Sequence, residues 1–249
     1  MAHTNPYADL GYEDFRRLAN DPGLSRYERI GFPNAYREGF EAHIFDDLRR
    51  KLPQLDLRQR RVLDVGPGCS ELPNLLIEHC RAQAHTLALI DSAEMLAHLP
   101  DAPFITKCPA LFPVCDDFLA QHQGQLDVIL CYSVLHYAIK DTAFFRFFDA
   151  ALALLAPGGQ LLLGDIPNIS KRKRFFASEA GVRFHQAFMQ TDEKPLVEFN
   201  RIEHDQIDDA IVLALVMRAR SQGFDAYLLP QDARLPMANR REDMLIIRP

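Results

Sequence analysis

The chain has 249 residues, of which 48% are hydrophobic and 25% charged, a composition too apolar for a disordered protein. At roughly 150 residues per domain, this length allows one large α/β domain or two small ones. The formal net charge of −6 disfavours a broad basic surface of the kind that binds rRNA or tRNA.

The sequence shows none of the usual signals for membrane insertion, export or disulfide bonding. The longest apolar run is Ala210–Met217, eight residues, whereas a helix needs roughly 20 to cross a bilayer. The first residues lack the pattern of a secretory signal, and the five cysteines include no Cys-x-x-Cys pair. We therefore expect a cytoplasmic monomer or homodimer with no membrane contact, no nucleic-acid partner and no metal site.

The spacing of apolar residues predicts an N-terminal helical cap followed by alternating strands and helices. In residues 1–60 the predicted helices are Tyr12–Ala19 and Ala35–Leu52, the second ended by Pro53. The strands that follow are predicted at Arg61–Val65, Leu87–Ile90, Phe104–Thr106, Val128–Tyr132 and Gln160–Gly164, and the helices at Glu71–Arg81, from Ser92, and at Asp141–Leu155. Short apolar strands between helices indicate a parallel sheet covered on both faces.

The last third of the sequence closes this sheet. Residues 168–202 are predicted as an irregular, basic and aromatic insertion, and Glu203–Gln222 as a long helix. Two strands, Ala226–Leu229 and Met244–Ile247, are predicted to form an antiparallel pair.

The turn Gly66-Pro67-Gly68 after the first strand carries the strongest functional signal. Glycine lets a ligand lie against the backbone, and open parallel sheets bind ligands at the carboxyl ends of their strands. Asp91 ends the second strand, about 20–25 residues on, the usual place for a carboxylate that binds ribose hydroxyls. Glu71 would oppose a pyrophosphate, which disfavours an NAD-dependent dehydrogenase, whereas Asp64 suits an ammonium group.

Four segments in order resemble the motifs of class I S-adenosylmethionine-dependent methyltransferases. They are Asp64-Val65-Gly66-Pro67-Gly68, Asp91-Ser92-Ala93-Glu94-Met95-Leu96, Leu126–Leu130 followed by Val134-Leu135-His136-Tyr137, and Leu155-Ala156-Pro157-Gly158-Gly159. The resemblance covers roughly residues 61–165, although the family often has a third glycine where Ser70 stands.

The resemblance implies a fold and a division of the chain. The expected fold is α/β and Rossmann-like, with a mostly parallel seven-stranded sheet, helices on both faces and a closing antiparallel strand. We expect one methyltransferase domain over residues 1–249. Its parts are the cap at 1–60, the cofactor-binding core at 61–165, a substrate-side insertion at 168–202 and the closing helix and strand pair at 203–249.

The resemblance also implies S-adenosyl-L-methionine as the cofactor and a set of residues that contact it. The Gly66–Gly68 backbone would approach the methionine part, Asp64 its amino group and Asp91 the ribose. The complete implied set is Asp64, Gly66, Pro67, Gly68, Asp91, Ser92, Met95, Cys108 and Ser133. Simpler interpretations stay open: a tight structural turn at the glycines, an N-cap at Asp91 paired with Glu94, and a core position for Met95.

Candidates for the catalytic and substrate-binding residues are less specific. His136, Asp165 and His185 are candidate bases, among which the sequence does not choose, and His136 equally fits a hydrogen-bonded core position. Tyr36 and Arg37 are candidates for substrate contact. Lys171, Arg172, Lys173 and Arg174 would hold a phosphate or carboxylate of the substrate or form a solvated face.

These observations lead to one preferred function and one alternative. Cys131-Tyr132-Ser133-Val134 stands where an Asn-Pro-Pro-Tyr-like tetrad would indicate adenine or glutamine methylation. We therefore expect methyl transfer to an oxygen or nitrogen atom of a small molecule, with a phosphorylated or nucleotide-linked sugar as the candidate acceptor. The alternative is a non-catalytic or regulatory protein that binds S-adenosylmethionine in the same fold.

Overall fold

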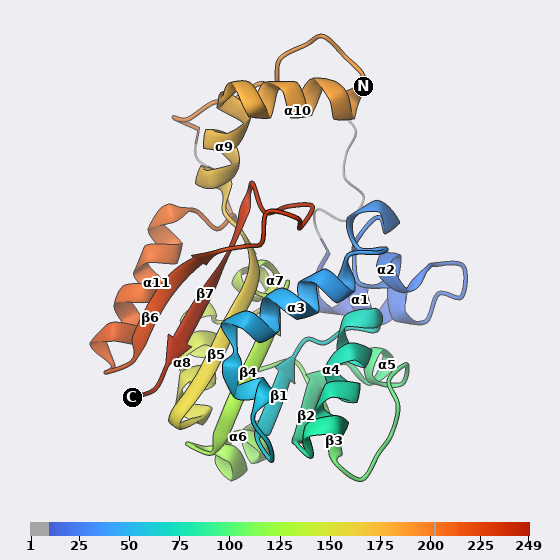
Figure 1. Ribbon diagram of the computed structural model, residues 1–249, viewed down its shortest axis with the longest axis vertical. Helices are drawn as coiled ribbons and strands as arrows, with labels where there is room; N and C mark the ends of the chain where they lie inside the picture. The colour runs from blue at the N-terminus through green and yellow to red at the C-terminus, as the bar shows by residue number, and fades with distance from the viewer. Residues whose placement is uncertain (1–9, 202) are drawn as a thin grey trace.

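The computed structural model describes residues 10–201 and 203–249, and a single seven-stranded sheet lies at its centre (Figure 1). The strand order is β3-β2-β1-β4-β5-β7-β6. The strands are β1 Arg61–Val65, β2 Thr86–Asp91, β3 Ile105–Pro109, β4 Leu126–Tyr132, β5 Leu155–Pro167, β6 Asp225–Pro230 and β7 Arg241–Ile247. Strand β7 is antiparallel to both neighbours, whereas β1 to β5 pair in parallel. The predicted fold class is confirmed.

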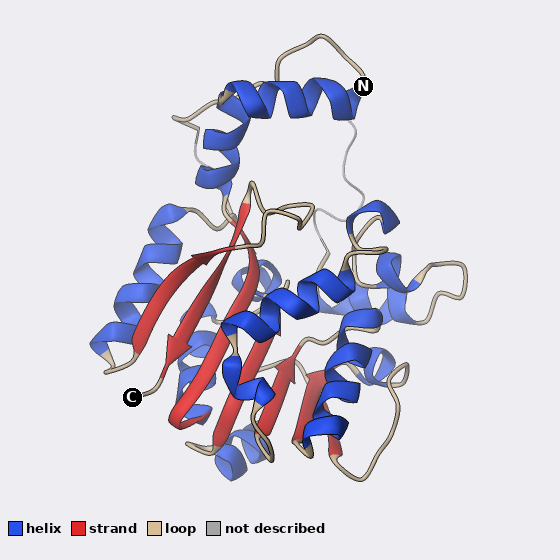
Figure 2. Ribbon diagram, in the orientation of Figure 1, coloured by secondary structure: helices blue, strands red, loops and turns tan. Residues whose placement is uncertain are grey.

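Helices cover both faces of the sheet (Figure 2). They are α1 Tyr12–Ala19, α2 Arg26–Arg29, α3 Glu41–Lys51, α4 Glu71–Gln83, α5 Ala93–Leu96, α6 Asp116–His122, α7 Leu135–Asp141, α8 Phe144–Leu154, α9 Ile169–Ala177, α10 Glu179–Met189 and α11 Asp209–Ser221, with single 3₁₀ turns η1 Asn34–Tyr36 and η2 Pro53–Asp56. Within the described residues, no helix combines the length and apolar character needed to cross a bilayer.

The two-residue repeat of a strand divides the core into two layers. Leu63 of β1 packs into the cluster formed with α8 and α11, which includes Phe148 and Leu215. Its neighbour Val62 points the other way, into the cluster formed with α3 and α4, which includes Leu48 and Leu76. Because both sides of β1 are buried, the strand reads as a continuous apolar run and not as an alternating one. The sheet is therefore fixed between two helical layers, and its carboxyl edge is held in place.

One of the predicted helices is wrong as a single element. The predicted helix Ala35–Leu52 is a 3₁₀ turn followed by α3, because the chain turns at Gly39, whose φ is +79°. The predicted helix Asp141–Leu155 is confirmed as α8, which begins at Phe144 because the preceding helix α7 extends to Asp141.

The predictions for residues 168–222 also need correction. The segment predicted to be irregular contains α9 and α10, whose first turns are capped by the side chains of Asn168 and Ser178. The long helix predicted from Glu203 begins only at Asp209, where the Asp208 side chain accepts a hydrogen bond from the Ile211 amide. The α9–α10 hairpin projects from the carboxyl edge of the sheet, at the top of Figure 1.

Candidate active site

The turn between β1 and α4 requires glycine at two positions. The φ angles are +69° at Gly66 and +65° at Gly68, a region that side chains disfavour. A Cβ atom at Gly66 would lie 2.5 Å from Val134 Cγ2, and one at Gly68 would lie 2.6 Å from Ile30 Cγ2. Larger residues would therefore clash with a neighbour, so this backbone is left open to approach from the pocket in front of it.

Asp91 at the end of β2 braces this turn. Its Oδ2 accepts a hydrogen bond from the Gly68 amide at 3.0 Å, and its Oδ1 accepts one from the Ser92 amide at 2.7 Å. The N-cap of α5 is Ser92, which accepts a hydrogen bond from the Met95 amide, so the interpretation of Asp91 as an N-cap is wrong. Burial raises the pKa of Asp91 to about 6, and the two amide donors oppose this rise. A carboxylate has further lone pairs, so two hydroxyls can still bind.

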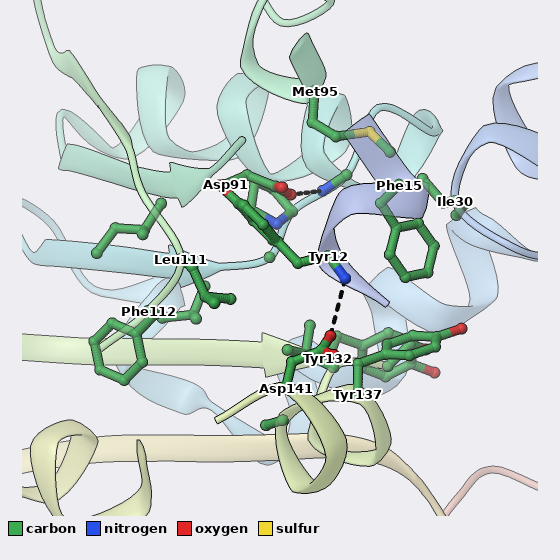
Figure 3. Close-up of a pocket in the computed structure, with 18 of the residues that line it drawn as sticks. Tyr12, Phe15, Ile30, Asp91, Met95, Leu111, Phe112, Tyr132, Tyr137 and Asp141 are labelled. Atoms are coloured by element: carbon green, nitrogen blue, oxygen red, sulfur yellow. Dashed lines mark hydrogen bonds between the residues drawn. The ribbon is translucent and has the colours of Figure 1, made fainter. Parts of the chain in front are cut away.

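A pocket of about 900 Å³, including the part open to solvent, lies over the carboxyl ends of β1, β2 and β4. Its walls are mainly apolar and aromatic. Figure 3 shows Leu111 and Phe112 toward one end of the pocket and Tyr132 and Tyr137 toward the other. A glycine turn, a carboxylate and an apolar slot suit a charged nucleoside such as S-adenosylmethionine.

The structure brings most of the predicted cofactor residues to this pocket, but not all. Those that line it are Gly66, Pro67, Gly68, Asp91, Met95 and Ser133. The predicted residues Asp64, Ser92 and Cys108 lie outside its lining. Asp64 is buried beneath the turn, and burial, followed by the charge of Asp91, raises its pKa to about 8. A residue that is adjacent in sequence to a pocket residue therefore does not necessarily line the pocket, because neighbouring side chains point in different directions.

Helix α1 supplies a wall of the pocket that the sequence analysis did not assign. Tyr12 and Phe15 line the pocket, and the Phe15 ring lies edge-on to Tyr137 at 4.7 Å between centroids. The Tyr12 amide donates a hydrogen bond to Asp141 Oδ2 at 2.9 Å (Figure 3). The aromatic residues of the predicted helix at 12–19 were the sequence feature that could have indicated a pocket wall. The sequence does not show which other segment they face.

Arg37 stands at the other end of the pocket with its side chain only 2% exposed. Its Nη2 donates hydrogen bonds to Asp165 Oδ2, at 3.3 Å, and to Ser133 Oγ. The guanidinium carbon lies 4.2 Å from the centroid of the Phe32 ring. Arg37 therefore presents a rigidly held positive charge beside Ser133, a residue at the end of β4.

Asp165 is the anchor of this arrangement. It lies outside the lining of the large pocket and borders a smaller adjoining hollow together with Tyr36. Its Oδ2 accepts a hydrogen bond from Arg241 Nη1 at 2.7 Å in addition to those from Arg37 and Ser133. Burial alone would raise the pKa of Asp165, but the guanidinium groups of Arg241 and Arg37 hold it below its usual value. Its charge is thus engaged within the protein.

The two candidate histidines lie apart from each other and outside the pocket lining. His136 is on α7, beside Tyr137, and burial lowers its pKa to about 3. Among the described residues, its Nδ1 is a buried nitrogen without a hydrogen-bond partner. His185 is on α10, edge-on to Phe176 at 6.3 Å between centroids. Among the described residues, no hydrogen bond or ion pair joins His136, Asp165 and His185, although the Asp165 charge acts on His136.

The basic run Lys171–Arg174 lies on α9 and also stays outside the pocket lining. Lys171, Lys173 and Arg174 bond to other groups of the protein, whereas the Arg172 guanidinium lies over the Phe176 ring. Contact of this run with a substrate remains a prediction.

The lowered pKa of His136 predicts a difference in how stability depends on pH. An unfolded chain binds a proton at this imidazole near pH 6.5, whereas the folded protein does so only near pH 3. This group therefore lowers the free energy of unfolding as pH falls from 7 to 5, while the raised pKa values of Asp64 and Asp91 act in the opposite direction in every variant. The change in the free energy of unfolding from pH 7 to pH 5 should thus be more favourable to folding in His136→Asn than in the wild type. Urea denaturation at both pH values measures this, with the exposed His43→Asn as the control. The same change with pH in the wild type and in His136→Asn would contradict an uncharged imidazole in the folded protein.

Comparisons with known proteins agree with this geometry. Residues 36–193 match the model of a family described as a methyltransferase domain. Chondramide synthase cmdD of Chondromyces crocatus is 33% identical over 121 residues, which is 47% of this chain but only 3% of that synthase. The match therefore spans a small part of that relative.

Solved structures share the fold at low sequence identity. The CurJ carbon methyltransferase superimposes with a TM-score of 0.56 at 16% identity, over 90% of this chain and 61% of the other. The 1,6-didemethyltoxoflavin-N1-methyltransferase of Burkholderia thailandensis, solved with its substrate and S-adenosylhomocysteine, superimposes with a TM-score of 0.50 at 14% identity, over 96% and 91% of the two chains. The match over residues 36–193 shows that the chain belongs to the methyltransferase-domain family, and its seven-stranded sheet has the Rossmann-like fold of these solved structures.

Proposed function

We propose that this protein transfers a methyl group from S-adenosylmethionine to an oxygen or nitrogen atom of a small molecule. The observation that carries the proposal is the single pocket that has the glycine turn and Asp91 at one end and Arg37 with Ser133 at the other. A phosphorylated or nucleotide-linked sugar is the acceptor class we favour. The negative overall charge of the chain and the concave, mainly apolar pocket support a small molecule over a polymer.

The proposed cofactor contacts follow from the pocket walls. The Gly66–Gly68 backbone would carry the methionine part, and Asp91 would accept hydrogen bonds from the ribose hydroxyls. Met95, Leu111 and Phe112 would enclose the adenine with apolar surface. A role of Asp64 toward the amino group is part of the proposal, although its side chain is buried outside the pocket lining.

The other end of the pocket would position the acceptor. When bound, the cofactor supplies a methyl group already activated by its sulfonium, so the protein chiefly has to align a nucleophile and exclude water. Tyr132 and Tyr137 give this end aromatic walls, and for a polar group of the acceptor Arg37 offers N–H donors and Ser133 a lone pair of its hydroxyl oxygen. Asp165 is a positioning residue in this scheme, because it holds both Arg37 and Ser133.

In this scheme, removal of a proton from the acceptor is less important than its alignment with the methyl group. His136 stays uncharged across the working pH range, which keeps it available to accept a proton, but its low pKa makes it a weak base. His185 lies in the α9–α10 hairpin, so it could act only on an acceptor that extends to that hairpin. An acceptor that is itself a good nucleophile, such as an amine or an ionised hydroxyl, suits this site best.

Two measurements test the proposal in sequence. Isothermal titration with S-adenosylhomocysteine should show one site per chain, and absence of binding by folded protein would overturn the proposal. Transfer of labelled methyl groups from S-adenosylmethionine should then be assayed on a panel of phosphorylated sugars, nucleotide-linked sugars and the same sugars without phosphate. Binding without transfer to any oxygen or nitrogen acceptor would favour the non-catalytic alternative.

A further inference from the structure

Arg240, in the turn before β7, joins three segments that are far apart in the sequence. Its guanidinium carbon lies 5.9 Å from the ring centroid of Tyr36, which is in η1, and 5.7 Å from that of Phe184, which is in α10. Its Nη1 donates a hydrogen bond to Asn239 Oδ1 at 2.9 Å. The two aromatic faces hold the planar guanidinium in place without using its other N–H donors.

A second arginine shares this aromatic cluster. The Arg172 guanidinium carbon lies 5.4 Å from the ring centroid of Phe176, and the Phe176 and Phe184 rings are 6.3 Å apart. Burial lowers the pKa of Arg240, and the nearby charges of Arg241 and Arg172 lower it further. Positive charge is thus concentrated where the hairpin meets the turn before β7.

No carboxylate forms an ion pair with these two arginines. Over residues 10–201 and 203–249, no ion pair joins Arg172 or Arg240 to an acid. The acids of the surrounding segments have other partners: Asp165, whose charge also acts on Arg240, bonds to Arg37 and Arg241, Asp209 to Arg174 and Asn168, and Glu242 to Asn168. Two arginines stacked on one aromatic cluster, neither of them paired with an acid, suit a bound anion.

The other cations of α9 have bonding partners within the protein. Lys171 Nζ donates a hydrogen bond to the Arg241 carbonyl at 2.6 Å, Lys173 Nζ lies 3.4 Å from Glu203 Oε1, and Arg174 pairs with Asp209. Of the four residues Lys171–Arg174, Arg172 therefore has the guanidinium that is still available to a ligand. The neighbouring Arg174 provides a control with the same charge on the same helix.

Tyr36 connects this cluster to the acceptor end of the pocket. Its ring faces the Arg240 guanidinium, and Tyr36 also lines the smaller hollow that adjoins the large pocket. The smaller hollow is lined by both Tyr36 and Arg37, and Arg37 also lines the large pocket. An acceptor held at Arg240 by one end can therefore extend toward Ser133 with the other.

We propose that Arg172 and Arg240 form the binding site for a phosphate group of the acceptor. The planar N–H pairs of arginine bind phosphate oxygens in pairs, and two such groups suit a phosphate dianion or a diphosphate. This inference rests on the proposed function, because the phosphate group belongs to the acceptor that the proposed function assigns. It assigns a role in substrate specificity to Arg240, a residue that belongs to none of the motifs found in the sequence.

Titration of the full chain with inorganic pyrophosphate, with S-adenosylhomocysteine already bound, tests the site. Arg172→Gln and Arg240→Gln should each raise the Kd for pyrophosphate at least about tenfold, the loss of one charge-assisted contact. Arg174→Gln should leave it within about twofold. Acetate should bind more weakly than pyrophosphate to the wild type.

Three results would overturn the proposed phosphate site. They are no binding of pyrophosphate by the wild type, an increase of the Kd in Arg174→Gln as large as in Arg172→Gln, and acetate binding as tight as that of pyrophosphate. The Kd for S-adenosylhomocysteine should be unchanged in Arg172→Gln, whose side chain is exposed and whose folding is not in question. If that nucleoside does not bind to the wild type, the proposed function fails, whereas its binding without pyrophosphate binding removes only the phosphate site.

Discussion

Asp91→Ala is expected to raise the Kd for S-adenosylhomocysteine at least about 100-fold. The variant loses the carboxylate proposed to bind two ribose hydroxyls, and hydrogen bonds to a charged group each contribute about 1.5–3 kcal/mol. It also loses the acceptor of the Gly68 amide, so the glycine turn is less well held. Isothermal titration measures the change.

Asp101→Ala is the matched control, because the Asp101 side chain is 92% exposed and pairs with Lys107 at the surface. An unchanged Kd in Asp91→Ala would exclude Asp91 from the cofactor site. The wild type should also bind more tightly as pH rises from 5 to 7, because the pKa of Asp91 is about 6 in the folded protein and its ionised form accepts hydrogen bonds better. Asp91→Asn should lack this pH dependence.

Asp165→Ala is expected to lower the free energy of unfolding by about 3–5 kcal/mol. The change leaves the buried Arg37 guanidinium, and that of Arg241 beside it, without the carboxylate that both contact. Uncompensated buried charge has a high desolvation cost, whereas a surface pair such as Asp149 with Arg218 contributes about 0–1 kcal/mol. Asp149→Ala is therefore the control in the same urea titration.

The dependence of this stabilisation on pH has a definite sign. The pKa of Asp165 is lower in the folded protein than in the unfolded chain, so its contribution is complete at neutral pH and is lost as the solution becomes acidic enough to protonate it. The difference between wild type and Asp165→Ala should thus shrink below about pH 4. A loss in Asp165→Ala no larger than that in Asp149→Ala would show that the two arginines find other partners.

The cofactor half of the site could be predicted from the sequence because its determinants are local. The backbone conformation of one turn requires glycine at positions 66 and 68, and Asp91 ends the next strand in the same sheet. Parallel strands end at a common edge of the sheet and bring such residues together, independently of how the helices pack. Asp64, Ser92 and Cys108 lie near the turn or a strand end but do not line the pocket, so their contact with the cofactor stays a prediction.

The acceptor half depended on contacts between distant segments. Arg37 meets Ser133 and Asp165 across 96 and 128 residues, and no local pattern indicates such pairs. The basic run on α9 was visible in the sequence, but only its packing shows that Arg172 differs from the three cations beside it.

The sequence by itself therefore determined the seven-stranded sheet, the glycine turn and the carboxylate at the end of β2. These features follow from side-chain periodicity and from the conformational freedom of single residues, which are properties of short segments. The tertiary structure decided which charges are engaged and which are free, because the state of a charged group depends on burial and on partners from other segments. It is this second kind of information that separates Arg240 from the other arginines and places it beside the acceptor end of the pocket.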